Sequence, residues 1–300
     1  MIRFANESDI TRIKELWGEA FGYDDFAKWY FENVFKLENT LVYEIDNGKV
    51  VSMLQRLPYY IKNIGESTYI YGACTDIKYR GKGMMGKLLS YSEAIDVAEG
   101  KMAIFLVPEN EGLFRFYEKK GYKNHFYKYL REKEENHIIA LESNNKLDLE
   151  VSDIEDKIEK TRDFLKKDDL LKCNKIADDM LDIYIYATKG SQHIMRDKMY
   201  FCRQISMHLS SDGKIFCAYL GNKLVGYTFG YVENDIYKIS ELVVQDDSIY
   251  NELMGDLNNK FSSIVVLNDL NGTIKIKYGC IKLLRKMLNV NKIIINLVYD

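Results

Sequence analysis

The segment that most constrains this chain is a glycine-spaced basic loop at residues 79–89, which follows a predicted strand and opens a predicted amphipathic helix. Its glycines lack a Cβ atom, so the backbone can approach a ligand closely there. The first N–H groups of a helix have no partner inside the helix and lie at the positive end of its dipole. Anions bind at such helix starts. We therefore interpret the loop as a pyrophosphate site.

Two other phosphate-binding loops fit this spacing less well. A nucleoside-triphosphate loop requires G-x-x-x-x-G-K-[ST], which the segment does not contain. Gly81, Gly83 and Gly86 satisfy the dinucleotide pattern G-x-G-x-x-G, but that pattern belongs in the first strand–helix unit of a domain. Here the loop follows a run of predicted hairpins, and an arginine precedes it. Glycine-rich strand-to-helix turns also occur for packing reasons, and the loop alone leaves that alternative open.

The residues before the loop predict three antiparallel strands. Asn47 and Gly48 separate two β-rich runs at residues 40–45 and 50–54, and an Asn-Gly pair in that position is a strong signal of a hairpin. A second turn is expected at residues 64–66. After it, residues 68–76 form a strand that leads into the loop.

The residues after the loop predict a helix and a buried strand. Apolar side chains recur with helical spacing through residues 84–98. Residues 102–107 are all apolar, which suits a parallel strand in the interior of a sheet, and Pro108 ends that strand. Residues 1–9 are typical of a strand followed by a helix cap. The order of elements therefore predicts an α/β fold with a mixed sheet.

This order, together with the sequence LFRFYEKKGY at residues 113–122, resembles the GCN5-related N-acetyltransferases, the GNAT superfamily. The loop of that family reads Q/R-x-x-G-x-G/A. Arg80 and Gly83 match it, whereas Met85 stands where the last small residue is usual, and Gly86 follows one step later. The resemblance covers residues 1–130 well and implies a GNAT fold.

Three shorter pieces, residues 71–75, 106–111 and 116–122, are similar to the Eis-like branch of the superfamily. The resemblance implies a site for acetyl-CoA, in which one strand end pairs with the pantetheine amides and the loop holds the pyrophosphate. Tyr117 would protonate the leaving thiolate, because a phenol and an alkyl thiol have similar pKa values. The residues expected to bind the cofactor are Ala73, Cys74, Thr75, Arg80, Gly81, Lys82, Gly83, Met84, Met85, Gly86 and Asn110.

Three assignments compete with simpler interpretations. Tyr117 lies on a short predicted helix, where aromatic side chains mostly pack into the core. Asn110 stands at a strand-to-helix junction, where it can cap the helix or bind the cofactor. Eis-like enzymes are thought to use the C-terminal carboxylate as general base, which implies a catalytic Asp300. Alternatively, the apolar run that ends at Asp300 only completes a sheet.

The second half of the chain repeats the pattern of the first. Strands are expected at residues 215–219, 223–232 and 236–244, a helix at about 248–259, and an apolar strand at 263–267. Where a cofactor loop would stand, residues 245–247 are Gln, Asp and Asp, which offer neither a glycine nor a positive charge. The second unit is therefore expected to have the scaffold without the cofactor loop.

We therefore expect two GNAT-like domains in tandem, at residues 1–133 and 134–300, joined by a polar connector. Residues 154–171 and 180–209 have helical spacing. Residues 278–284 resemble the segment that leads out of the central unit of Eis-like proteins toward a sterol-carrier-like domain. That domain is expected to be missing here, or reduced to one helix and one strand.

The composition disfavours several function classes. A net charge of −3 over 300 residues indicates neither a nucleic-acid groove nor a surface for acidic membranes. The cysteines at positions 74, 173, 202, 217 and 280 and the histidines at 125, 137, 193 and 208 lack metal-ligand spacing. We therefore expect no metal, and reduced thiols in a cytoplasmic protein. Cys74 as a nucleophile is a minor alternative, because no histidine stands in a motif beside it.

The resemblance thus implies an acetyl-CoA-dependent N-acetyltransferase that acts on a primary amine of a small molecule. An acidic chain can offer a negative pocket to a cationic amine. The alternative is a CoA-binding sensor or regulatory module without transfer activity. The identity of the acceptor stays open, because fold does not name substrate. The oligomeric state stays open too, although Eis-like proteins are commonly homo-oligomers.

Overall fold

The computed structural model describes residues 1–46, 48–131, 149–154, 174–270, 272, 274–285 and 293–294. The chain divides into two compact units, each with its own hydrophobic core. Unit 1 consists of Met1–Phe126, Gln192–Met195 and Tyr278–Ile293, and unit 2 consists of Tyr127–Ser191, Arg196–Lys277 and Ile294–Asp300.

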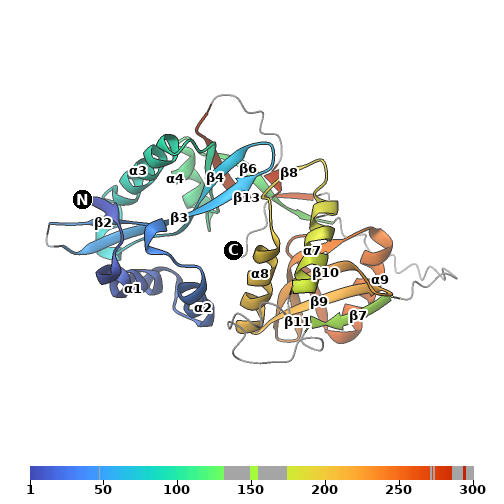
Figure 1. Ribbon diagram of the computed structural model, residues 1–300. Helices are drawn as coiled ribbons and strands as arrows, with labels where there is room; N and C mark the ends of the chain where they lie inside the picture. Colours follow the sequence, from blue (N-terminus) through green and yellow to red (C-terminus); the bar gives the residue numbers. More distant parts are fainter. Residues whose placement is uncertain are drawn as a thin grey trace. The chain divides into compact units, whose positions relative to one another are not determined.

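Unit 1 is built on a mixed sheet (Figure 1). Its first strands are β1 (Ile2–Phe4), β2 (Thr40–Glu44), β3 (Val50–Ile61) and β4 (Gly65–Thr75), each antiparallel to the one before it. The three antiparallel strands predicted before the loop are thus confirmed, although Asn47 of the first hairpin turn lies outside the described residues. β5 (Ala103–Leu106) is fully buried and parallel to β4, as its apolar sequence predicts.

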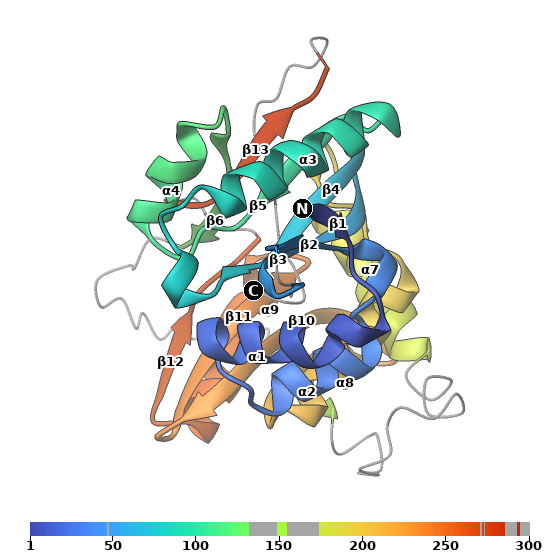
Figure 2. The ribbon, with the colours of Figure 1, turned by 90° about the vertical axis from the view of Figure 1, so that its left-hand side faces the viewer.

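Helices cover both faces of this sheet (Figure 1 and Figure 2). On one face lie α1 (Ile10–Phe21) and α2 (Asp25–Asn33), and on the other lie α3 (Met84–Ala98) and α4 (Glu111–Glu118). Short 3-10 turns occur at Glu7–Asp9, Leu37–Asn39 and Ile77–Tyr79. The bounds of α3 are those that its apolar spacing predicts, because Leu88 and Leu89 on its buried stripe pack against the sheet.

Later segments extend the sheet beyond β5. β13 (Ile274–Leu283) pairs antiparallel with β5, from Cys280↔Leu106 to Leu283↔Ala103. Across the sheet follow β6 (Lys123–Leu130), β14 (Ile293–Ile294) and β8 (Gln192–His193). Residues 278–284, whose sequence resembles the segment that leads out of the central unit of Eis-like proteins, lie in the sheet of unit 1. Their backbone groups pair with the edge of β5.

Unit 2 repeats the order of antiparallel strands, helix and parallel strand. Its sheet has the order β12-β11-β10-β9-β7. The strands are β7 (Leu149–Asp153), β9 (Gly213–Leu220), β10 (Lys223–Glu233), β11 (Ile236–Val244) and β12 (Ser263–Val266). β9, β10 and β11 are antiparallel, and β12 is parallel to β11, as β5 is to β4. The predicted repeat is thus present in the structure.

The helices of unit 2 also cover two faces of its sheet (Figure 1). α7 (Asn174–Ala187) and α8 (Lys198–Ser210) share one core cluster with the sheet, and α9 (Asp247–Lys260) belongs to another. The helical spacing expected through residues 180–209 is interrupted between α7 and α8, where Gly190 has a φ of 84° and β8 forms. A helix cannot pass through that left-handed residue. Helical spacing is also expected at residues 154–171, and of these residues all but Ile154 lie outside the described residues.

Candidate functional site

The pairing of β4 with β5 ends before β4 reaches the loop. The β4–β5 pairing runs only from Ser67↔Ala103 to Tyr69↔Phe105, whereas the β4–β3 pairing continues to Thr75. The register of β3 and β4 shifts near Gly72, which has a φ of 57°. A Cβ atom there would lie 2.6 Å from a ring carbon of Trp17, so only glycine fits. The β5 ladder therefore does not reach the last three residues of β4, and an extended ligand could pair with that edge.

The last residues of β4 are held from the β3 side. The Ser52 hydroxyl donates to the Cys74 carbonyl at 3.0 Å and lies 2.7 Å from the Thr75 hydroxyl. The side chain of Ala73 packs against the core under α3 and α4. Burial raises the pKa of the Cys74 thiol to about 12, and Glu19 nearby adds to the effect. A thiol with that pKa stays protonated, which argues against Cys74 as a nucleophile.

The loop after β4 contains two glycines with positive φ whose Cβ positions face open space. Gly81 and Gly83 have φ values of 76° and 80°, a conformation that other residues adopt only with strain. A Cβ atom at either glycine would meet no other atom within 4 Å, so no packing requirement explains these glycines. The Arg80 Nε atom donates to the Thr75 carbonyl at 3.1 Å, which holds this arginine beside the end of β4.

The N-terminus of α3 has no side-chain cap. Its N-cap residue is Gly83, in the left-handed conformation, whereas Asp24, Asn110 and Asp246 cap α2, α4 and α9 with side-chain hydrogen bonds. The helix begins at Met84 and Met85, and the N–H groups of a first helical turn lack partners inside the helix. The first N–H groups of α3 therefore have no side-chain acceptor at this N-cap, and helix starts of this kind favour anions.

Positive side chains surround this helix start. The ammonium groups of Lys82, Lys87 and Lys120 lie 4.7, 5.8 and 5.1 Å from the ring centres of Tyr79, Tyr43 and Phe116, respectively. Within the described part of the chain, neither these lysines nor Arg80 lie within ion-pair distance of a carboxylate. Four cations without acidic partners at a helix N-terminus repel one another and the helix dipole, and a bound anion relieves both effects.

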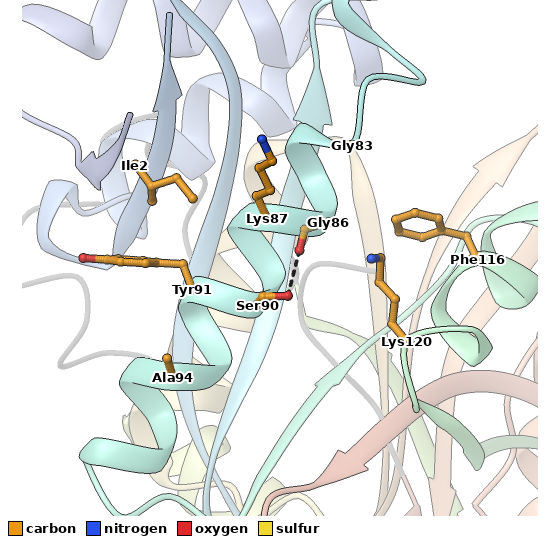
Figure 3. A pocket seen from close by; sticks show the side chains of 9 residues that line it. All are labelled: Ile2, Gly83, Gly86, Lys87, Ser90, Tyr91, Ala94, Phe116 and Lys120. Atoms are coloured by element: carbon orange, nitrogen blue, oxygen red, sulfur yellow. Dashed lines mark hydrogen bonds between the residues drawn. The ribbon is translucent and has the colours of Figure 1, made fainter.

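An open pocket of about 590 Å³ lies along α3 next to this site. Figure 3 shows Lys120 pointing toward Gly86, with Phe116 beside it. A Cβ atom on Gly86 would lie 2.7 Å from the Lys120 Nζ atom, so this glycine also makes room for the lysine. Sequence reasoning did not assign Lys120 or Phe116 to the site, because only the fold brings the end of α4 against α3. The residues that line the pocket are Ile2, Gly83, Gly86, Lys87, Ser90, Tyr91, Ala94, Phe116 and Lys120.

Tyr117 lies on α4 in the core cluster against which Ala73 and Met85 also pack. The candidate acid, the strand end and the start of α3 thus all contribute to one core cluster. The tyrosine side chain is 6% exposed, and burial raises its pKa to about 12, with a smaller contribution from Cys280. The phenol is therefore neutral at physiological pH, the form that a general acid requires.

The two remaining assignments have different outcomes. Asn110 caps α4, since its side-chain oxygen accepts from the Leu113 N–H at 3.1 Å, and a contact of its amide with a cofactor stays a prediction. Asp300 lies outside the described residues. Among the residues that the structure describes, no group of acidic, His and Cys side chains is arranged to hold a metal. None of the described helices combines the length and hydropathy that a membrane span requires.

The sequence of unit 1 matches a known family over nearly its whole first segment. Residues 1–124 match a GNAT acetyltransferase domain. The matched residues include β4, β5, the glycine loop and α3. No curated protein matches the sequence.

Solved structures share the fold over most of the chain. A protein of unknown function from Enterococcus faecalis V583, described as a probable N-acyltransferase, has a TM-score of 0.67 at 13% identity, over 95% of this chain and 72% of its own. A GCN5-related N-acetyltransferase from Anabaena variabilis has a TM-score of 0.63 at 14% identity, over 95% and 73%. Eis1 from Mycobacterium abscessus has a TM-score of 0.61 at 11% identity, over 95% and 73%. At these identities the likeness establishes the fold alone, and it extends beyond the residues 1–124 that match the family.

Proposed function

We propose that this protein is an acetyl-CoA-dependent N-acetyltransferase that acetylates a primary amine of a small acceptor. The match of residues 1–124 to an acetyltransferase domain supports acyl transfer. The observation that carries the donor assignment is the uncapped start of α3 at Gly83, surrounded by cations without acidic partners. A pyrophosphate would accept hydrogen bonds from the first turn of α3 and neutralise these charges.

The arrangement suggests a division of roles. The loop from Arg80 to Gly86 would hold the pyrophosphate, and the β4 edge at residues 73–75 would pair with the pantetheine amides. A backbone N–H at this strand end would polarise the thioester carbonyl. The neutral amine would attack the carbonyl carbon, the C–S bond would break, and Tyr117 would protonate the departing thiolate.

The proton balance also requires a base. The ammonium form of a free primary amine has a pKa of about 10, so the acceptor must lose a proton to water or to a carboxylate before it attacks. The resemblance to the Eis-like branch assigns this role to the C-terminal carboxylate of Asp300. We propose Asp300 as this base and a small cationic amine as the acceptor.

A CoA-binding regulatory module is the second candidate. The burial of Tyr117 in a core cluster favours it, because a phenol that only packs would leave donor binding without turnover. Both candidates require CoA binding. They differ in whether any amine accelerates the loss of acetyl-CoA.

Calorimetric titration with CoA and acetyl-CoA tests the donor site. We expect micromolar binding by the wild-type protein and a loss of about 100-fold in affinity for Arg80→Glu, which places a negative charge beside the helix start. Arg203→Glu is the matched control, since Arg203 is an exposed residue of α8 in unit 2. Equal affinities for the wild type and the Arg80 variant would contradict the proposed site. With binding established, a screen of amines then separates the two candidate functions.

A further inference from the structure

Asp76 is a buried carboxylate at the point where the chain leaves β4 for the anion loop. Its side chain accepts hydrogen bonds from three segments. The Arg12 Nη2 atom of α1 donates at 2.7 Å, the Lys49 ammonium of the β2–β3 connection at 3.1 Å, and the Lys78 backbone N–H at 3.0 Å. One carboxylate therefore ties α1 and a hairpin to the turn that begins the loop.

The backbone of Asp76 is fixed as well. Its N–H donates to the Val51 carbonyl at 2.9 Å, and its carbonyl accepts from the Tyr79 N–H at 2.8 Å. Arg12 is held in place by the Val50 carbonyl at 3.2 Å and by Glu15 at 2.9 Å. The partner that reaches Asp76 from α1 is therefore itself held by further hydrogen bonds.

The contacts continue from Asp76 to a cation of the loop. The Lys49 ammonium, which is bonded to Asp76, also lies 5.6 Å from the ring centre of Tyr79. The Lys82 ammonium lies 4.7 Å from the same ring centre. The Tyr79 ring thus lies within reach of both ammonium groups, and its position helps to set that of Lys82.

A carboxylate close to an anion site weakens anion binding by repulsion, unless neighbouring cations neutralise its charge. Arg12 and Lys49 neutralise Asp76, and the hydrogen bonds of Asp76 supply the geometry. We propose that Asp76 is a positioning residue for the anion loop. It acts through the Lys78 amide and through Lys49, Tyr79 and Lys82, and it does not touch the donor. The proposal rests on the proposed function only for the identity of the anion.

The test compares Asp76→Asn with Asp9→Asn. Asp9 is equally buried, pairs with Arg3 at 2.6 and 2.9 Å and accepts from the Asn6 N–H at 2.8 Å. Both variants remove a buried carboxylate from an arginine, and both should lower the melting temperature. At a temperature where both are folded, we expect Asp76→Asn to weaken CoA binding about tenfold and Asp9→Asn to change it less than twofold. A lower melting temperature with unchanged CoA affinity in Asp76→Asn would overturn the proposal.

Two further variants cover the case in which Asp76→Asn does not fold. Lys49→Met removes one partner of Asp76 from a part-exposed position and should weaken CoA binding about threefold. Lys49→Arg keeps a cation at this position and should bind CoA with the affinity of the wild type. Lys28→Met, at an exposed ion pair of α2, is the control. Unchanged affinity in Lys49→Met would count against the proposal.

Hydrogen exchange separates this proposal from the proposed function. If the wild-type protein binds no CoA, the proposed function fails, but the effect of Asp76 on the loop can still be measured. Amides of residues 77–83 should exchange faster in Asp76→Asn or Lys49→Met than in the wild type, and should not change in Asp9→Asn. Equal exchange in this loop across all variants would reject Asp76 as its positioning residue.

Discussion

At the scale of single residues, Tyr117 carries the chemistry of the proposed reaction. Its phenol is buried in the core cluster against which Ala73 also packs, and burial raises its pKa to about 12. Tyr117→Phe removes only the hydroxyl group, so the packing of the ring against Phe116 and Tyr122 should survive. We expect kcat to fall about 100-fold with little change in the affinity for acetyl-CoA, because the hydroxyl acts only on the leaving thiolate.

The pH dependence of kcat in the wild type and in Tyr117→Phe supplies the control. A phenol whose pKa is raised stays protonated as the pH rises through 10, so the wild-type rate should not fall up to that pH. The rate should instead rise as the acceptor amine loses its proton. A rate that is unchanged in Tyr117→Phe would return this tyrosine to a packing role and favour the regulatory module.

At the scale of elements, α3 and α9 occupy the same place in the two repeats but differ at their first residue. Asp246 caps α9 with hydrogen bonds from the Ser248 and Ile249 amides at 2.9 and 3.1 Å, whereas Gly83 leaves α3 without a side-chain cap. A carboxylate at the helix start satisfies the donors that an anion would otherwise bind. We therefore expect the same element to bind an anion in unit 1 and not in unit 2.

Gly83→Asp should place a carboxylate at the start of α3, as Asp246 does at the start of α9. Gly83 has a φ of 80°, so any side chain there strains the backbone, but aspartate tolerates a positive φ better than most residues and the Cβ position is open. We expect the affinity for CoA, measured by calorimetry, to fall at least about 100-fold, because the new carboxylate repels the pyrophosphate. Gly83→Asn adds a neutral side chain of similar shape and should cause a smaller loss. Equal losses in the two variants would show that charge is not involved.

At the scale of the whole molecule, two units of similar topology share one chain, and only unit 1 has the glycine loop. We expect one CoA bound per chain, since the α9 start in unit 2 is already capped by Asp246. Calorimetric stoichiometry measures this directly. A second equivalent of CoA that survives in Arg80→Glu would place a donor site in unit 2 and contradict the comparison of the two helices.

Much of the fold follows from short-range features of the sequence. The bounds of α3, the three antiparallel strands and the buried β5 were predictable, because apolar spacing and turn residues act within a few positions of one another. The repeat in unit 2 and its missing loop were predictable for the same reason. The candidate loop at Arg80 and Gly83 was also predictable, since glycine and charge spacing are local signals.

Other features were decided only by the tertiary structure. Lys120 reaches the start of α3 through the packing of α4, β13 joins the edge of β5 from far along the chain, and Asp76 gathers Arg12 and Lys49. These partners are separated by tens to hundreds of residues, and no local pattern encodes such distances. The sequence by itself thus determined the elements and the chemistry available to them. The packing of those elements decided which charges meet at the helix start and which carboxylate positions the loop.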